Sequence, residues 1–213
     1  MKVMVFVDLE NFNKSVSALG QREPVIGGLH KFLSEYLENN LSWSRYNPHF
    51  IRTYLYTGTF EDNLKAKLKR QYANETDLEK RHLLEGKIKH VEKKQLIQKQ
   101  IFKELLDCDF VELRTKPLQY SPVDLSIFQK GVDVQIAVDL LTFGHSNNYD
   151  VAILCTGDVD LLESVRYIKN MGKKVILLSH PNLMAYELGR IADHFIDITK
   201  ISEDNINFFS KIK

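Results

Sequence analysis

Acidic side chains follow two strongly apolar segments of this chain, and both segments are short enough to be buried strands. The carboxyl ends of parallel strands meet at one edge of an open α/β sheet, in the crevice where such sheets bind ligands. Carboxylate oxygens gathered there suit Mg²⁺ or Mn²⁺. The residues concerned are Asp8, Glu10 and Asn11 after residues 3–7, and Asp158 and Asp160 after residues 151–155.

A further acidic pair lies in a predicted helix over residues 131–143, with Asp133 in its first turn and Asp139 six residues later. Six residues rotate a side chain by about 240° around a helix axis, so both aspartates cannot point straight at one cation. We favour a role for Asp139 in holding Lys130, a water or a neighbouring ligand in place. The alternative is that it is buried against the sheet and bonded to backbone donors. For Asp133, attraction to the helix dipole is the simpler alternative.

Phosphodiester hydrolysis requires an activated water and a means of spreading charge on the phosphate, and a divalent cation supplies both. The pattern therefore predicts a metal-dependent hydrolase with Asp8, Asp133 and Asp158 as its catalytic, metal-binding carboxylates. A simpler role also stays open, because Asp8, Thr156 or Asp158 could cap the helix that follows its strand. We assign supporting roles to four further residues, Asn11, Asp139, Asp160 and Lys130.

Strand-like and helix-like segments alternate along the chain, which predicts a mostly parallel sheet with helices on both faces. The expected fold class is α/β, a three-layer Rossmann-like arrangement with sheet order 3-2-1-4-5 and a sixth strand at the edge. The first and fourth strands are neighbours in this order, so Asp8 and Asp158 face each other at the switch point. The predicted strands span residues 2–7, 49–58, 109–115, 150–155, 173–179 and 194–198.

A single domain is expected over residues 1–200, followed by a helical tail over residues 201–213. Ser202 is a candidate N-cap for the tail helix. The proline-bounded segment 117–122 is expected to form a loop. Gly144 is expected to end the helix over residues 131–143 as its C-cap.

Residues 61–107 form an insertion with a composition of its own, without proline and rich in Lys, Leu, Glu and Gln. Residues 63–103 contain twelve Lys and Arg against five Asp and Glu, a balance of +7 in a chain of net charge +1. We expect one long helix or a hairpin with a break near residues 73–76. The insertion either contacts an RNA backbone or joins two copies in a homodimer through its apolar stripe. The cations selected for RNA contact are Lys65, Lys69 and Arg70.

Composition excludes several classes of protein. A hydrophobic content of 44% and a charged content of 27% are ordinary for a globular protein, and no apolar run approaches the roughly 20 residues of a membrane span. The N-terminus lacks a signal-peptide layout, and the two cysteines make neither a disulfide framework nor a zinc site, so we expect a cytoplasmic location. The seven histidines have no metal-site spacing, and glycine-rich nucleotide-binding motifs are absent.

Four segments carry a family resemblance: VFVDLENFN, KGVDVQIAVDLL, YDVAILCTGDVDLLESVRYIKNMGKKV and LGRIADHFIDI. In order and spacing, over residues 2–58 and 109–198, they resemble the NYN-domain family, which includes LabA-like proteins and belongs to the PIN-like nuclease superfamily. The resemblance implies a PIN-like fold, an acidic Mg²⁺ or Mn²⁺ site and RNA as substrate. By position, Asp8, Asp133 and Asp158 match the family's acidic core, and Asn11, Asp139 and Asp160 match further motif positions. The basic helical insertion departs from the family pattern.

The leading hypothesis is therefore a metal-dependent ribonuclease, an (endo)ribonuclease whose mode of cutting, within the strand or from an end, the sequence leaves open. The alternative is a catalytically inactive RNA-binding or protein-interaction module on the same fold. A phosphoryl-receiver domain is disfavoured because Arg114 and Ser179 stand near where its acceptor aspartate and lysine would be. A dehalogenase-like phosphatase is disfavoured because Glu10 stands where its second aspartate would be.

Overall fold

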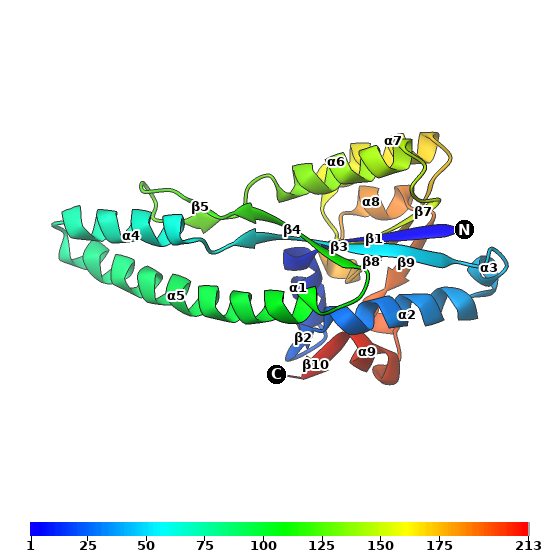
Figure 1. Ribbon diagram of the computed structural model, residues 1–213, viewed down its shortest axis with the longest axis horizontal. Coiled ribbons are helices and arrows are strands. Elements are labelled where there is room, and N and C mark those ends of the chain that lie inside the picture. Colours follow the sequence, from blue (N-terminus) through cyan, green and yellow to red (C-terminus); the bar gives the residue numbers. More distant parts are fainter. Residues whose placement is uncertain (213) are drawn as a thin grey trace.

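The computed structural model describes residues 1–212, apart from the side chains of residues 41 and 42. Its centre is a parallel sheet of six strands in the order β4-β3-β1-β7-β8-β9 (Figure 1). This order confirms the predicted α/β arrangement, with β9 at the edge. The strands are β1 (Lys2–Asp8), β3 (His49–Thr59), β4 (Val111–Pro117), β7 (Val151–Cys155), β8 (Lys174–Ser179) and β9 (His194–Asp197).

Two hydrophobic cores lie on the two faces of the sheet, because successive side chains of a strand point to opposite faces. In β1, Val3, Val5 and Val7 enter one core, while Met4 and Phe6 enter the other. All five are buried, so β1 is central and covered on both faces, as its apolar run predicts. The first core is covered by α1 (Leu9–Ser17), α2 (Ile26–Asn39) and α9 (Glu203–Phe209), and the second by α6 (Val132–His145), α7 (Leu162–Asn170) and α8 (Tyr186–Ile191).

The expected C-cap at Gly144 is wrong, because α6 continues to His145 and the left-handed residue beyond it is Asn147, with φ of 55°. Gly144 is instead a close-packing position. A Cβ there would lie 2.8 Å from the hydroxyl oxygen of Tyr149, which itself donates a 2.7 Å hydrogen bond to the carbonyl of Leu140. The glycine is required by the packing of Tyr149 against α6.

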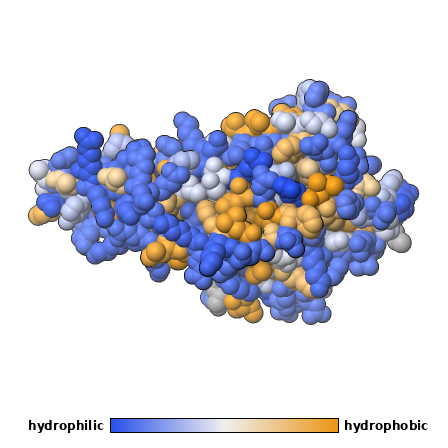
Figure 2. All heavy atoms as spheres, viewed as in Figure 1, coloured by the Kyte–Doolittle hydropathy of each residue, from blue (hydrophilic) through white to orange (hydrophobic). Residues whose placement is uncertain are grey.

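The insertion forms a helical hairpin of α4 (Asp62–Asn74) and α5 (Leu78–Leu106), with its break at residues 75–77. Asp77 caps α5 by accepting the N–H groups of Glu79 and Lys80. The hairpin is the crossover between β3 and β4 and projects away from the sheet (Figure 1). Its visible face is largely hydrophilic (Figure 2). Despite the 29-residue length of α5, no helix within residues 1–212 has the combined length and apolarity of a membrane span.

A third hydrophobic cluster fixes the hairpin against the segment that follows β4. The predicted loop 117–122 is wrong in part, because β5 (Gln119–Tyr120) pairs antiparallel with β6 (Ile127–Phe128). Strands of two residues are too short to leave a periodic pattern in the sequence. The buried members of the cluster are Leu64, Leu68, Leu84, Val91 and Leu125.

The C-terminal tail is only partly helical. The helix α9 follows Ser202 as expected, although the Ser202 side chain forms no capping hydrogen bond. Beyond it, β10 (Ser210–Ile212) pairs antiparallel with β2 (Arg22–Pro24), so the helical expectation is wrong for these residues, while residue 213 lies outside the described part. The buried Arg22 guanidinium donates to the side-chain oxygens of Asn207 and Ser210 and so ties the tail to β2.

Candidate metal centre and its cleft

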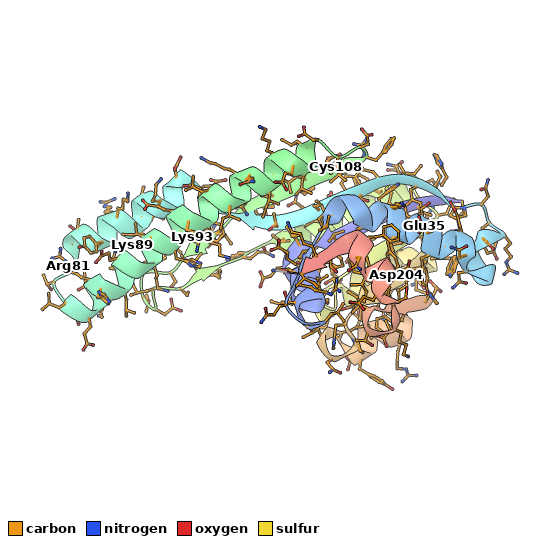
Figure 3. All side chains as sticks on the ribbon, turned by 90° about the horizontal axis from the view of Figure 1, so that it is seen from below. Glu35, Arg81, Lys89, Lys93, Cys108 and Asp204 are labelled. Atoms are coloured by element: carbon orange, nitrogen blue, oxygen red, sulfur yellow. The ribbon has the colours of Figure 1, made fainter. Side chains whose placement is uncertain are left out.

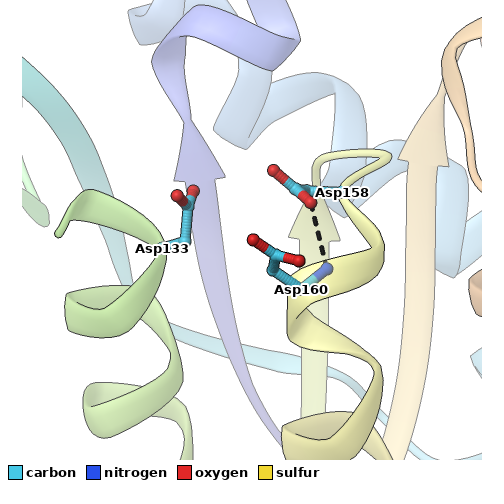
Figure 4. A group of neighbouring side chains, drawn as sticks. All are labelled: Asp133, Asp158 and Asp160. Carbon is cyan, nitrogen blue, oxygen red and sulfur yellow. Dashed lines mark hydrogen bonds between the residues drawn. The ribbon is translucent and has the colours of Figure 1, made fainter. Parts of the chain in front are cut away.

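Three aspartates from two elements gather at the carboxyl edge of the sheet (Figure 4). Each of Asp133, Asp158 and Asp160 offers a carboxylate oxygen within 4.8 Å of the other two. Asp133 lies in the first turn of α6, and the other two lie in the short helix η1 (Val159–Leu161) and its cap, after β7. Asp160 is thus part of the group, although the sequence assigned it only a supporting role.

The turn after β7 fixes Asp158 by local geometry. A Cβ on Gly157 would lie 2.1 Å from the carbonyl oxygen of Leu183, so only glycine fits there. The N–H of Asp158 donates to the hydroxyl of Thr156 at 3.2 Å, and the N–H of Asp160 donates to the Asp158 carboxylate at 3.0 Å. Asp158 is therefore the cap of the short helix that follows, and Thr156 fixes the turn before it, so both residues position the carboxylate that faces Asp133.

Asp8 ends β1 and caps α1 at the same time. It is 1% exposed, and its Oδ1 accepts the N–H groups of Glu10 at 3.0 Å and Asn11 at 3.1 Å. The side-chain amide of Asn11 donates to Oδ2 at 2.6 Å. Asp8 is outside the group of three but borders the same cleft as Asp133 and Asp158. Asp8, Asp133 and Asp158 therefore border one cleft, and their binding of a single cation stays a prediction.

The pKa values of two carboxyl groups in this cleft are raised. Burial raises the pKa of Asp133, and the charges of Asp8 and Asp158 raise it further. Burial also raises the pKa of Asp8, while the hydrogen bonds from Asn11 lower it. A bound cation would relieve the repulsion between these carboxylates. The donor set of hard oxygens fits Mg²⁺ or Mn²⁺.

Lys14 is a cleft residue that the sequence analysis missed. It lies on α1, which was not predicted as a helix, and its ammonium is 2.7 Å from the carboxylate of Glu10. This hydrogen bond raises the pKa of Lys14, and the charges of Asp8 and Asp158 contribute. The alternative of Asp8 as an N-cap is correct, and extending a helix from it would have placed Asn11 and Lys14 on one helical face.

Asp139 and Lys130 lie elsewhere. The Asp139 carboxylate accepts a 2.9 Å hydrogen bond from the hydroxyl of Tyr56 and is 3.8 Å from Nε of Arg114. Both partners belong to the sheet, so Asp139 does not hold Lys130 or a metal ligand in place as we expected. The alternative of burial against the sheet is closer, but the donors are side chains and not backbone groups. Lys130 is exposed and does not line the cleft, whereas its neighbour Gln129 does and accepts the N–H of Gly58 at 2.8 Å.

The cleft has a volume of about 980 Å³ and extends from the aspartates to the hairpin. Its polar wall opposite the aspartates comes from α5, and its apolar lining comes mainly from the ends of β3 and the β5–β6 segment. The basic residues selected from the sequence are absent from this lining. Lys65 pairs with Asp62 at 3.0 Å, and Lys69 pairs with Glu92 at 3.0 Å. The α5 residues in the lining are His82, Leu83, Gly86, Lys87 and His90.

Fold and site together define a three-layer α/β domain of nuclease type, with an acidic centre at the switch point of its sheet. The chain belongs to the NYN domain family, whose model matches residues 2–199. This family denotes nuclease-like domains that typically use divalent metals. No curated protein matches the chain significantly. A solved structure of a protein of unknown function from Vibrio parahaemolyticus is similar in fold, with 19% identity and a TM-score of 0.59, covering 95% of this chain and 94% of that one.

Proposed function

We propose that this protein hydrolyses the phosphodiester bonds of RNA in a metal-dependent reaction. The observation that carries the proposal is the mutual approach of Asp133, Asp158 and Asp160 within 4.8 Å at the sheet edge. A divalent cation held there would supply Lewis acidity toward the phosphate and a bound water of lowered pKa. Membership of a nuclease-like family supports the same reaction class.

Each residue of the cleft has a role in this proposal. Asp133, Asp158 and Asp160 hold the cation, and Asp8 completes the ligand set with its orientation fixed by Asn11. Lys14 borders the same cleft, and its ammonium is paired with Glu10, so it would attract an incoming phosphate by exchanging this carboxylate for the phosphate oxygens. Asn11 therefore orients a carboxylate, and Lys14 attracts the substrate.

Three further expectations stay proposals. RNA is the proposed partner because the hairpin is basic and its cleft adjoins the aspartates.

A homodimer through the hairpin is the competing use of this surface. The exposed apolar side chains of α5 that would serve it include Leu96 (71% exposed), Ile97 (44%) and Ile101 (42%). A cytoplasmic location agrees with Cys108 and Cys155 both being free thiols.

The test is a cleavage assay with labelled single-stranded and structured RNA in Mn²⁺, Mg²⁺ or EDTA. We expect cutting with either metal, none in EDTA and none with Asp158→Asn. Asp204→Asn, an equal charge change on the distant helix α9, is the matched control and should cleave as the native protein does (Figure 3). Metal-independent cutting, or a fully active Asp158→Asn variant, would contradict the proposal. RNA binding without cleavage under all conditions would instead support an inactive binding module.

A further inference from the structure

One face of α5 turns toward the acidic centre. Residues 82, 83, 86, 87 and 90 recur at the spacing of a single helical face, and all of them line the cleft that Asp8, Asp133 and Asp158 border. The face carries two imidazoles, an ammonium and a gap at Gly86. Because this face lies across the cleft from the carboxylates, a substrate at the acidic centre would extend along it.

The position of α5 is fixed by contacts at the base of the hairpin. The side-chain amide of Gln98 donates to the carbonyl of Gly58 at 2.8 Å and accepts the N–H of Phe60 at 2.9 Å. Gln95 is buried and donates to Asp62 at 3.1 Å. Leu84 and Val91, on the other side of α5, are fully buried in the third hydrophobic cluster. The cleft face is therefore a wall of defined orientation.

The charge on this wall is available to a ligand. Within residues 1–212, Lys87 forms no ion pair, whereas Lys89, two positions along, is paired with Glu85 at 2.7 Å. An unpaired, half-buried ammonium facing a cleft is a site for an anionic group such as phosphate. The wall thus presents free positive charge where the opposite side presents carboxylates.

The apolar lining of the cleft suits nucleobases. Phe128 is 42% exposed and Leu83 is 56% exposed, and both border the cleft together with Phe60. An exposed aromatic ring suits an unpaired strand, because every base presents a π-face for stacking, and Phe128 borders the same cleft as Lys87. A base paired in a duplex has no free face, so a duplex would gain nothing from these rings.

We propose that the α5 face formed by His82, Gly86, Lys87 and His90 is a second binding site, which holds the sugar–phosphate backbone of an unpaired strand whose bases lie on Phe128. The inference rests on the proposed function only in placing the phosphate to be cut at the aspartates. The binding of the strand to α5 does not depend on it. The wall positions the substrate, and the aspartates act on it.

Gly86 gives the proposal a steric test. Nothing lies within 4 Å of a Cβ placed on this residue, although glycine inside a helix is less stable than alanine by about 1 kcal/mol. The open space is where the strand would pass. The bulky Gly86→Phe should therefore block binding.

The decisive measurement is the affinity of a fluorescent, unstructured RNA oligonucleotide in EDTA, by anisotropy over a range of salt concentrations. Lys87→Glu should weaken binding at least tenfold and lower the salt slope by about 0.7, the effect of one lost single-strand phosphate contact. Phe128→Ala should weaken binding by about tenfold. The control is Lys93→Glu, the same charge change on the same helix at an exposed residue outside the cleft lining (Figure 3).

Equal losses for Lys87→Glu and Lys93→Glu would overturn the proposal, because binding would then follow net charge alone. It would also be overturned by a duplex that binds as tightly as the single strand, or by unchanged binding in Gly86→Phe. Thermal melts of every variant separate misfolding from lost contacts. Because binding is measured without metal, an absence of cleavage would contradict the proposed hydrolysis and leave this site standing.

Discussion

The side-chain amide of Asn11 donates to the carboxylate of Asp8 over 2.6 Å, and this bond joins the end of β1 to the first turn of α1. One carboxylate oxygen of Asp8 is engaged by two backbone N–H groups and the other by Asn11. The Asn11 bonds lower the Asp8 pKa against the effect of burial. The residue is therefore an immobile acceptor that three donors hold in one orientation.

Replacement of Asp8 separates its two roles. Asp8→Asn should keep the fold, because asparagine caps a helix as well as aspartate does, yet it should abolish metal-dependent cleavage. Asp8→Ala should lose cleavage and in addition about 1 kcal/mol of stability, since the cap is removed. Cleavage assays and urea denaturation check both. Near-native activity in Asp8→Asn would show that only the cap matters.

Asp133→Asn should raise the melting temperature of the metal-free protein by a few degrees. The pKa of Asp133 is raised, so its charged form is the unfavourable one in the folded state. That penalty is complete above the folded pKa and is relieved as the pH falls toward the unfolded value of 3.8, so the advantage of the variant should shrink in acid. Added Mn²⁺ should make the native protein melt at the higher temperature, because only the native protein is stabilised by the bound cation. Calorimetry in EDTA and in Mn²⁺ provides the comparison.

Asp139 should prove structural. Asp139→Ala leaves the Tyr56 hydroxyl without its acceptor and removes the carboxylate 3.8 Å from Nε of Arg114, whose guanidinium keeps its ion pair with Glu112, at a cost of about 1–3 kcal/mol. The rate of cleavage by the folded fraction should change little. A double-mutant cycle with Tyr56→Phe should give a coupling energy of about 0.5–3 kcal/mol. Lost cleavage at unchanged stability would return Asp139 to the active site.

Two helical glycines should respond to alanine in opposite directions. Gly86→Ala should stabilise the protein by about 1 kcal/mol, because the site is open and alanine favours helix. Gly144→Ala should destabilise it by about 1–3 kcal/mol, since the added methyl group would crowd the buried Tyr149 hydroxyl at 2.8 Å. Denaturation midpoints measure both. A stabilised Gly144→Ala would contradict the packing of Tyr149 against α6.

Stability should fall as the pH drops from about 6.5 toward 5, because burial lowers the pKa of both His30 and His194. A lowered pKa means that the folded state favours the neutral ring, so the stabilisation is complete above the unfolded pKa and is lost as the pH falls through the folded one. The combined variant His30→Phe, His194→Gln should flatten this part of the profile. Urea titrations at several pH values test it.

The sequence predicted the sheet order because strand-like and helix-like segments alternate along the chain, and the central strands β1 and β7 are continuous apolar runs. It also predicted the positions of Asp133 and Asp158, since both depend on local signals at the start of a helix and the end of a strand. The two-residue and three-residue strands were missed because they leave no periodic pattern. The α5 wall of the cleft was missed for another reason. We chose Lys65 because its segment is basic, but the face that α5 turns toward the cleft depends on the packing of Leu84 and Val91 on its other side.

The third hydrophobic cluster, which packs the hairpin, shares no residue with the two cores of the sheet. Such a unit is expected to open and close on its own, with a smaller opening free energy than the sheet. Amide hydrogens of α4 and α5 should therefore exchange with solvent before those of β1 and β7. The same independence makes the hairpin an exchangeable part: evolution could replace this crossover, and with it the choice of ligand, while the chemistry at the strand ends stayed in place.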